Sequence, residues 1–260
     1  MTESIQTIMI KAVIFDLGGV LIDLDLERCR KAFAEDVGYR KIDELLDAWH
    51  QKGFYSDLEE GKLSADEFRR KIIEGSVSAG HSVPTTESVS CAESVPSTES
   101  VSCAESVPST ESVPSTGSVP AVSPDEVDHA MWALLTGIEP YKIDFLRELS
   151  GKYDLYLLSN NNGISMVRCR QIFKEAGLPM EKVFRKQYLS YEMKMLKPSP
   201  QIYRAVIDDI GLSPDEMLFI DDSVSNVAAA ASLGIHAVQY VPGADLRAAV
   251  NAGLEGDGTC

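Results

Sequence analysis

Short apolar runs that alternate with amphipathic segments constrain the fold of this chain more than any other feature. Four runs have the length and composition of buried β-strands, and they lie at residues 12–15, 153–158, 217–220 and 236–240. Apolar residues at helical spacing follow these runs, as in residues 164–176. The alternation predicts an α/β fold, in which helices cover both faces of a parallel sheet. Ligands of such sheets bind at the carboxyl ends of the strands.

The segment between the first two apolar runs has a different pattern. Residues 26–135 indicate helices and no strand. The spacing of apolar residues predicts one helix over 26–37, ended by a glycine, and another over 42–49. Capping boxes of the form Ser-x-x-Glu begin two further predicted helices at Ser64 and Ser123.

A hexapeptide repeat lies between the last two of these helices. The pair Ser-Val recurs every six residues from Ser82 to Val119. A left-handed β-helix needs about three hexads per turn, so seven units give barely two turns. Each unit offers one valine and proline recurs, so the segment buries too little apolar area to offset its ordering entropy. We predict a disordered acidic loop over residues 76–122.

The charge is concentrated in this part of the chain. The net charge is −16, and the window from Ile72 to Tyr141 supplies −10, because it holds ten acidic residues and neither lysine nor arginine. Such acidity argues against a nucleic-acid partner, since no basic surplus neutralises phosphates. No apolar run is long enough for a transmembrane helix, and the first residues make a poor signal peptide. Five cysteines without a CxxC pair indicate reduced thiols and a cytoplasmic protein. We find no signal for an oligomeric state.

Polar residues follow three of the four apolar runs. Asp16 follows the first, Ser159-Asn160 the second and Asp221-Asp222 the third, while Lys197-Pro198 precedes a predicted helix. These side chains are expected at one edge of the sheet. Crowded carboxylates repel each other unless a cation is present, and hard oxygen ligands suit Mg²⁺. A nearby lysine and serine suit a phosphoryl group. The pattern therefore predicts a Mg²⁺ site that binds a small phosphorylated substrate.

The order of these motifs resembles that of the haloacid dehalogenase superfamily. Members of that superfamily have an Asp motif first, then Ser or Thr, then Lys, and paired acids last. The resemblance covers the chain except the repeat. It implies a doubly wound, Rossmann-like core at residues 1–24 and 140–260, and an inserted helical cap at residues 25–139. Asp23 lies where the cap begins, and we expect it in a solvated turn.

The resemblance also implies the roles of the acidic motifs. Asp16 would be the nucleophile that forms an aspartyl phosphate, and would also bind Mg²⁺. The backbone carbonyl of Gly18 would be a second metal ligand. Asp222 aligns with the acid that binds the metal directly in the family, and Asp221 would lie beside it in direct or indirect contact.

The remaining motif residues receive supporting roles in the same way. Ser159 and the backbone N–H of Asn160 would hold the phosphoryl oxygens. Lys197 would neutralise developing charge and orient Asp16. Asn226 would orient the paired acids.

Each residue also has an interpretation without function. Asp16 could be a turn residue, although a buried acid without a partner is costly. Ser159 could be a helix N-cap, and Lys197 a surface lysine. Asp221 or Asp222 could cap the next helix. The functional interpretation is favoured because the four motifs occur together and in order.

One position departs from the family pattern. The general acid of the family is an Asp two residues after the nucleophile, where this chain has Gly18. Glycine keeps the carbonyl ligand but cannot protonate a leaving group, a contribution of about 10²–10⁴-fold in rate. The protein is therefore expected either to favour substrates with a good leaving group, such as an anomeric sugar phosphate, or to be a weakly active or non-catalytic relative. A haloacid dehalogenase is disfavoured, because that chemistry needs no metal and leaves the paired acids unused.

The repeat generates a direct prediction. Deleting residues 76–122 is expected to leave the melting temperature and any activity nearly unchanged, because a short turn can join the flanking helices. Thermal unfolding of the shortened chain checks this, and a large drop in melting temperature would show that the repeat is part of the packed structure.

Overall fold

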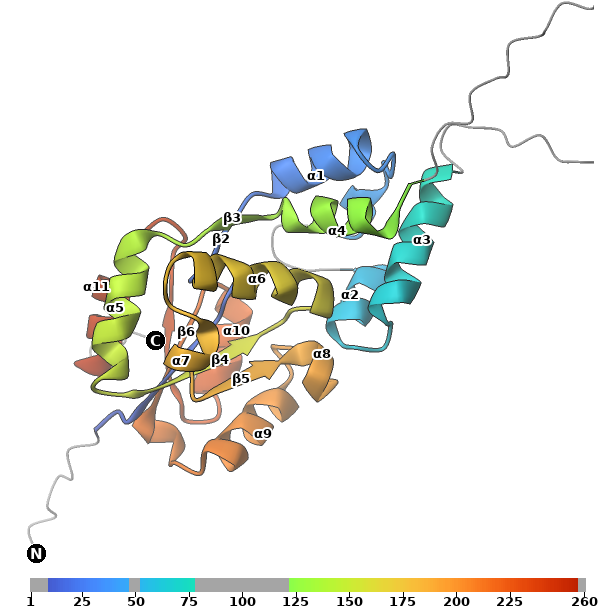
Figure 1. Ribbon diagram of the computed structural model, residues 1–260. Coiled ribbons are helices and arrows are strands. Elements are labelled where there is room, and N and C mark those ends of the chain that lie inside the picture. Colours follow the sequence, from blue (N-terminus) through green and yellow to red (C-terminus); the bar gives the residue numbers. More distant parts are fainter. Residues whose placement is uncertain (1–8, 47–51, 78–121, 257–260) are drawn as a thin grey trace, which may run out of the picture.

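A five-stranded parallel sheet forms the centre of the molecule. The computed structural model describes residues 9–46, 52–77 and 122–256 (Figure 1). The strand order is β5-β4-β1-β6-β7. The strands are β1 (Ala12–Phe15), β4 (Asp154–Ser159), β5 (Lys186–Leu189), β6 (Met217–Asp221) and β7 (His236–Gln239). The predicted doubly wound α/β fold is confirmed, and the four predicted strands are all present.

Helices cover both faces of the sheet because apolar side chains alternate along its strands. Val13 and Phe15 of β1 pack into one cluster, whereas Ala12 and Ile14 pack into another on the opposite face. The first face is covered by α5 (Pro140–Ser150), α6 (Gly163–Glu175), α7 (Met180–Val183) and α11 (Leu246–Leu254). The second is covered by α9 (Pro200–Ile210) and α10 (Val224–Ala231). The central strands are thus buried on both sides.

A separate group of helices lies to one side of the sheet (Figure 1). It comprises α1 (Leu26–Glu35), the short 3₁₀ turn η1 (Ile42–Glu44), α2 (Gly53–Glu59), α3 (Ala65–Val77) and α4 (Pro124–Trp132). These helices enclose their own apolar cluster, which includes Phe33 and Phe68. The helical cap expected from the sequence is therefore present, and both capping boxes are formed. We call these helices the cap, although the domain limits given above remain a prediction.

Two local expectations differ from the structure. The helix predicted over 42–49 is only the turn at 42–44, and residues 47–51 lie outside the described part. The repeat also lies outside the described residues, but α3 continues to Val77, so the loop predicted to begin at residue 76 overlaps the end of a helix.

A small antiparallel ribbon connects the cap to the sheet, and it was not predicted. It pairs β2 (Asp23–Leu24) with β3 (Leu135–Gly137). Beside it, the fully buried Lys142 forms ion pairs with Asp23 at 3.0 Å and Glu139 at 3.1 Å. The expectation that Asp23 lies in a solvated turn was wrong about the turn, because the residue is in β2, whereas its partly exposed carboxylate is the partner of a buried lysine from α5. Runs of two or three residues are too short to give a strand pattern.

The end of α2 is fixed to the core by two further contacts. Ser190 begins α8 (Ser190–Met193), and its hydroxyl donates to the carbonyl of Glu59 at 2.6 Å. Lys194 donates from Nζ to the carbonyl of Gly61 at 2.6 Å. Gly61 has φ +67°, and a Cβ there would lie 2.2 Å from the carbonyl oxygen of Tyr191. Only glycine fits this contact between cap and core.

The remaining elements complete the core. They are the turn η2 (Pro214–Glu216) and the strand β5, whose Lys-Gln-Tyr-Leu sequence is too short and too polar to stand out as a strand. Among the described residues, no helix combines the length and apolarity that a membrane span requires.

Gly61 provides a test of the docking of α2. Gly243 has a similar φ of +85°, but a Cβ there would have no other atom within 4 Å, so Gly243→Ala is a matched control. Left-handed backbone costs alanine about 1–2 kcal/mol at either site. Gly61→Ala is expected to lower the free energy of unfolding by about 2 kcal/mol more than Gly243→Ala does, because the Tyr191 carbonyl must also move. Denaturant unfolding measures both, and equal losses would contradict the close contact.

Candidate active site

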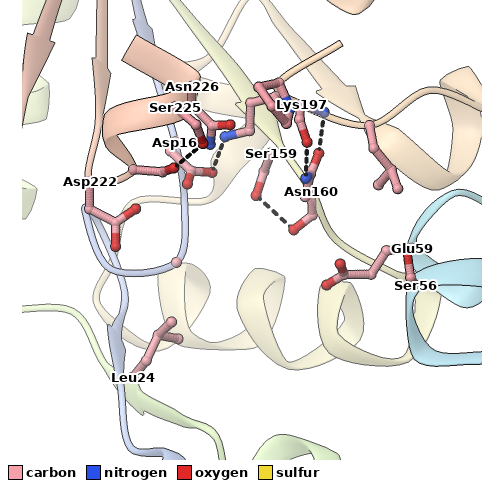
Figure 2. A pocket seen from close by; sticks show the side chains of 14 residues that line it. Asp16, Leu24, Ser56, Glu59, Ser159, Asn160, Lys197, Asp222, Ser225 and Asn226 are labelled. Carbon is pink, nitrogen blue, oxygen red and sulfur yellow. Dashed lines mark hydrogen bonds and ion pairs between the residues drawn. The ribbon is translucent and has the colours of Figure 1, made fainter. Parts of the chain in front are cut away.

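Asp16 lies directly beyond β1 at the carboxyl edge of the sheet, where Figure 2 shows it among the other polar side chains. Its N–H donates to the carbonyl of Ile220 at 2.9 Å, which ties it to β6. Its Oδ1 accepts from the N–H of Leu17 at 2.7 Å. The residue is 8% exposed. Parallel pairing of β1 with both neighbours thus delivers this carboxylate to the middle of the edge.

Lys197 is the centre of the site. Its Nζ lies 2.9 Å from Asp16 Oδ1 and 2.6 Å from Asp221 Oδ2, and it donates to the carbonyl of Leu158 at 3.0 Å. All three ammonium hydrogens therefore have acceptors. The side chain is almost completely buried, which contradicts its interpretation as a surface lysine. Its charge compensates part of the negative charge of the two acids.

The paired acids have different environments. Asp221 is fully buried, and its Oδ1 accepts from the N–H of Ser223 and from Nδ2 of Asn226, both at 2.9 Å. Its Oδ2 is held by Lys197. Asp222 is partly exposed and lines the cavity, beside the loop at Gly19 (Figure 2). Protein donors thus occupy both oxygens of Asp221, whereas the carboxylate of Asp222 makes no hydrogen bond to another side chain among the described residues.

The three acids fit a divalent cation. Asp16, Asp221 and Asp222 each present a carboxylate oxygen within 4.8 Å of the others. Gly18 borders the same cavity, and in the described part of the chain no backbone N–H donates to its carbonyl. An all-oxygen set of this kind suits Mg²⁺. The accessible carboxylate of Asp222 favours it as a direct ligand, with Asp221 fixed beside it by Lys197 and Asn226.

The pKa values of the acids in this cluster also favour a bound cation. Burial raises the pKa of Asp16 to about 7, with Lys197 opposing the rise and Asp221 and Asp222 adding to it. Burial and the charge of Asp221 raise the pKa of Asp222 to about 6. Burial alone would lower the pKa of Lys197, but Asp16 and Asp221 raise it, so the lysine stays charged. One lysine does not compensate three acids, and a cation would favour their ionised forms.

Ser159 is the last residue of β4 and Asn160 follows it, on the other side of Asp16. The Ser159 side chain lines the cavity, and its hydroxyl has only a long contact of 3.4 Å to the carbonyl of Asn160. The Asn160 side chain forms two hydrogen bonds with the backbone of Lys197, at 2.8 and 2.9 Å. Asn160 therefore positions the lysine segment, in addition to the backbone role expected from the sequence. The structure brings together every residue that the sequence analysis singled out at this edge.

The cap completes the wall of a cavity of about 280 Å³. Ser56 and Glu59 of α2 face it, and Figure 2 shows the Glu59 carboxylate pointing into it, with Asp16 and Lys197 across the cavity. Sequence reasoning missed both residues. The available signal was that Tyr55, Leu58 and Glu59 share one buried helix face, which places an acid among apolar residues.

The two residues that follow Asn160 have structural roles. Asn161 donates its N–H to Ser190 Oγ at 2.9 Å, and its Oδ1 accepts from the N–H of Asn162. Asn162 caps α6 by accepting from the N–H of Ser165. Neither lines the cavity.

Comparison with known proteins identifies the family. The family of haloacid dehalogenase-like hydrolases matches residues 10–234. The chain belongs to this family. A curated relative, a D-ribitol-5-phosphate phosphatase from Bacteroides thetaiotaomicron, is 32% identical over 240 residues, which cover 92% of this chain and 96% of the relative.

Solved structures of family members agree with this assignment. A Bacteroides thetaiotaomicron enzyme of the family, in complex with magnesium and inorganic phosphate, is 34% identical with a TM-score of 0.69, covering 91% of this chain and 96% of that one. A HAD-like family hydrolase from Porphyromonas gingivalis is 29% identical with a TM-score of 0.68, covering 94% of this chain and 97% of that one.

The buried lysine generates a prediction about stability. Lys197→Met removes the compensating charge from two buried acids, so we expect a loss of about 3–5 kcal/mol in the free energy of unfolding. Lys186→Met is the control, because Lys186 pairs with Asp209 at the surface, where such pairs contribute at most about 1 kcal/mol. Urea unfolding without metal measures both variants. Similar losses would show that the Lys197 contacts do not stabilise the fold.

Proposed function

We propose that this protein is a Mg²⁺-dependent phosphomonoester hydrolase that works through an aspartyl phosphate on Asp16. The observation that carries the proposal is the cluster of Asp16, Lys197, Asp221 and Asp222 at the edge of the sheet, with three carboxylates within 4.8 Å of one another. A nucleophilic carboxylate, a cation site and a buried ammonium are what phosphoryl transfer through an enzyme carboxylate requires.

The proposed substrates are small sugar or polyol phosphates. The support is the curated relative, a D-ribitol-5-phosphate phosphatase with which this chain aligns over 92% of its length. The cavity of about 280 Å³ is small and has polar walls, which suits a compact hydroxylated molecule. Ser56 and Ser225 add hydroxyl groups to those walls.

The carboxylate of Asp16 is positioned before the reaction. Its Oδ1 is held by the N–H of Leu17 and by Lys197, which fixes the plane of the group. An oxygen of Asp16 attacks phosphorus, and the bond to the leaving oxygen breaks. Fixing the nucleophile in this way removes rotational entropy from the step.

The phosphoryl oxygens are expected to contact the opposite strand end. The hydroxyl of Ser159 and the backbone N–H of Asn160 donate to them, and Lys197 balances the charge that develops near Asp16. Asp16, the Gly18 carbonyl and Asp222 would hold Mg²⁺, with Asp221 adjacent. When bound, the ion would supply positive charge to the phosphoryl group. Asn226 and Ser223 keep Asp221 in place.

The alternative of a weakly active or non-catalytic relative rests on Gly18. Dehalogenation is disfavoured because it needs no metal. Asp222 presents a carboxylate to the cavity beside Asp16 and Asp221, and a metal-free reaction would leave this cluster of acids unused. We also propose a cytoplasmic location, supported by Cys29 and Cys169, which are buried free thiols.

The proposal is tested by two substitutions and a chelator. Asp16→Asn is expected to lower hydrolysis of para-nitrophenyl phosphate by more than about 10³-fold, because it removes the nucleophile. Excess chelator should abolish activity, and added Mg²⁺ should restore it. Asp222→Asn is expected to weaken Mg²⁺ binding at least about tenfold, measured by calorimetry.

Asp208→Asn is the control, since Asp208 is an exposed acid on α9. It should bind Mg²⁺ and hydrolyse phosphate esters like the unchanged protein. Activity that survives Asp16→Asn, or that persists in chelator, would contradict the proposed function.

A further inference from the structure

Glu59 is a buried acid that faces the cavity from the cap. It is 7% exposed, yet no hydrogen bond or ion pair to its carboxylate occurs among the described residues. Such a group costs free energy in the folded protein when it is ionised, and a neutral carboxyl group is favoured. Its side chain points into the cavity that Asp16 and Lys197 line (Figure 2). An isolated acid aimed at a reacting group is a candidate for proton transfer.

The position of Glu59 is fixed from the core side. Ser190 is fully buried and donates to the backbone carbonyl of Glu59, and Lys194 holds the carbonyl of Gly61 two residues later. Gly61 packs against the backbone of Tyr191 with no room for a side chain. The cap therefore presents the Glu59 carboxylate to the cavity from a docked helix end.

Among the described charged residues of the site, Glu59 is the one that has no other assigned contact or role. Gly18 has no side chain, Lys197 uses all three hydrogens on Asp16, Asp221 and Leu158, and Asp222 is the proposed cation ligand. A displacement at phosphorus places the leaving oxygen opposite Asp16. Glu59 and Ser56 are the residues of the cap helix α2 that line the cavity.

We propose that Glu59 is the general acid and base of the reaction, in place of the acid that Gly18 lacks. The proposal rests on the phosphatase function proposed above. Sugar and polyol phosphates with alkoxide leaving groups would then be substrates, and a good leaving group would not be needed.

The protons balance over the two steps. In the first, Asp16 forms a bond to phosphorus, the bond from phosphorus to the ester oxygen breaks, and that oxygen takes the proton of Glu59 to leave as an alcohol. In the second, the Glu59 carboxylate takes a proton from water as the water oxygen attacks phosphorus. The bond from phosphorus to Asp16 then breaks, which releases inorganic phosphate and restores protonated Glu59.

The ionisation of Glu59 agrees with this cycle. Burial raises the pKa of its carboxyl group to about 8, with Asp16 adding to the rise and Lys197 opposing it. Tyr55 on the same helix also interacts with Glu59, and the Glu59 charge raises the pKa of its phenol further. Glu59 is therefore protonated at neutral pH, as a donor must be.

The test compares leaving groups of similar shape. Para-nitrophenyl, phenyl and benzyl phosphate share a ring, carry no hydroxyl, and have leaving oxygens of rising basicity. In Glu59→Gln, kcat/KM is expected to stay near that of the unchanged protein for the nitrophenyl ester and to fall by about 10²-fold or more for the benzyl ester. Glu60→Gln is the matched control, because Glu60 pairs with Lys62 away from the cavity, and it should show no such trend.

The outcomes separate the two proposals. A loss in Glu59→Gln that is equal for all three esters would overturn the proton-transfer role and leave the phosphatase intact. Failure of the unchanged protein with Mg²⁺ to hydrolyse any of the three would overturn the proposed function itself. The unchanged protein gives a second measure, independent of folding of the variant: its kcat/KM should decline little across the series, and a steep decline would count against a general acid.

Discussion

The buried ammonium of Lys197 is the interaction on which the site depends. It contacts Asp16, Asp221 and the carbonyl of Leu158, and so joins the ends of β1, β6 and β4. Removing it would leave two buried acids without their compensating charge. The strand order places these three strands side by side, so their carboxyl ends meet at one point. The same arrangement that satisfies the buried charges also brings together Asp16, the paired acids and Ser159, which are the nucleophile, the cation site and the phosphate contact of the proposed function.

The core of this fold could be predicted because its determinants are local. The β1 and β6 segments are continuous apolar runs, and each run leads directly into an acid. The positions of Asp16, Ser159 and Asp221 at strand ends were enough to predict that they meet, and the order of the motifs added Lys197. The strand β5 was missed because pairing with β4 and burial, more than its own sequence, define it. The ribbon of β2 and β3 is too short to show periodicity.

The cap residues of the site could not be predicted in the same way. Glu59 is followed by Glu60, and a pair of acids at the end of a short helix usually indicates a solvated surface. The end of its helix is docked by Ser190, which contacts the Glu59 carbonyl, and by Lys194, which contacts the Gly61 carbonyl, and both lysine and serine are distant from it in the sequence. Lys142 is a similar case, because its partner Asp23 lies on the far side of the cap insertion. Gly18 indicated that a proton donor was missing, but only the tertiary structure shows which residue faces the cavity.

The central claim is that Asp16 carries the phosphoryl group between two proton transfers. The most direct measurement is mass spectrometry of the protein quenched with acid during turnover of a phosphate ester in the presence of Mg²⁺. A phosphoryl adduct on Asp16, formed and lost at the rate of turnover, is the predicted result. Turnover without any adduct on Asp16, or with the adduct on another residue, would contradict the account.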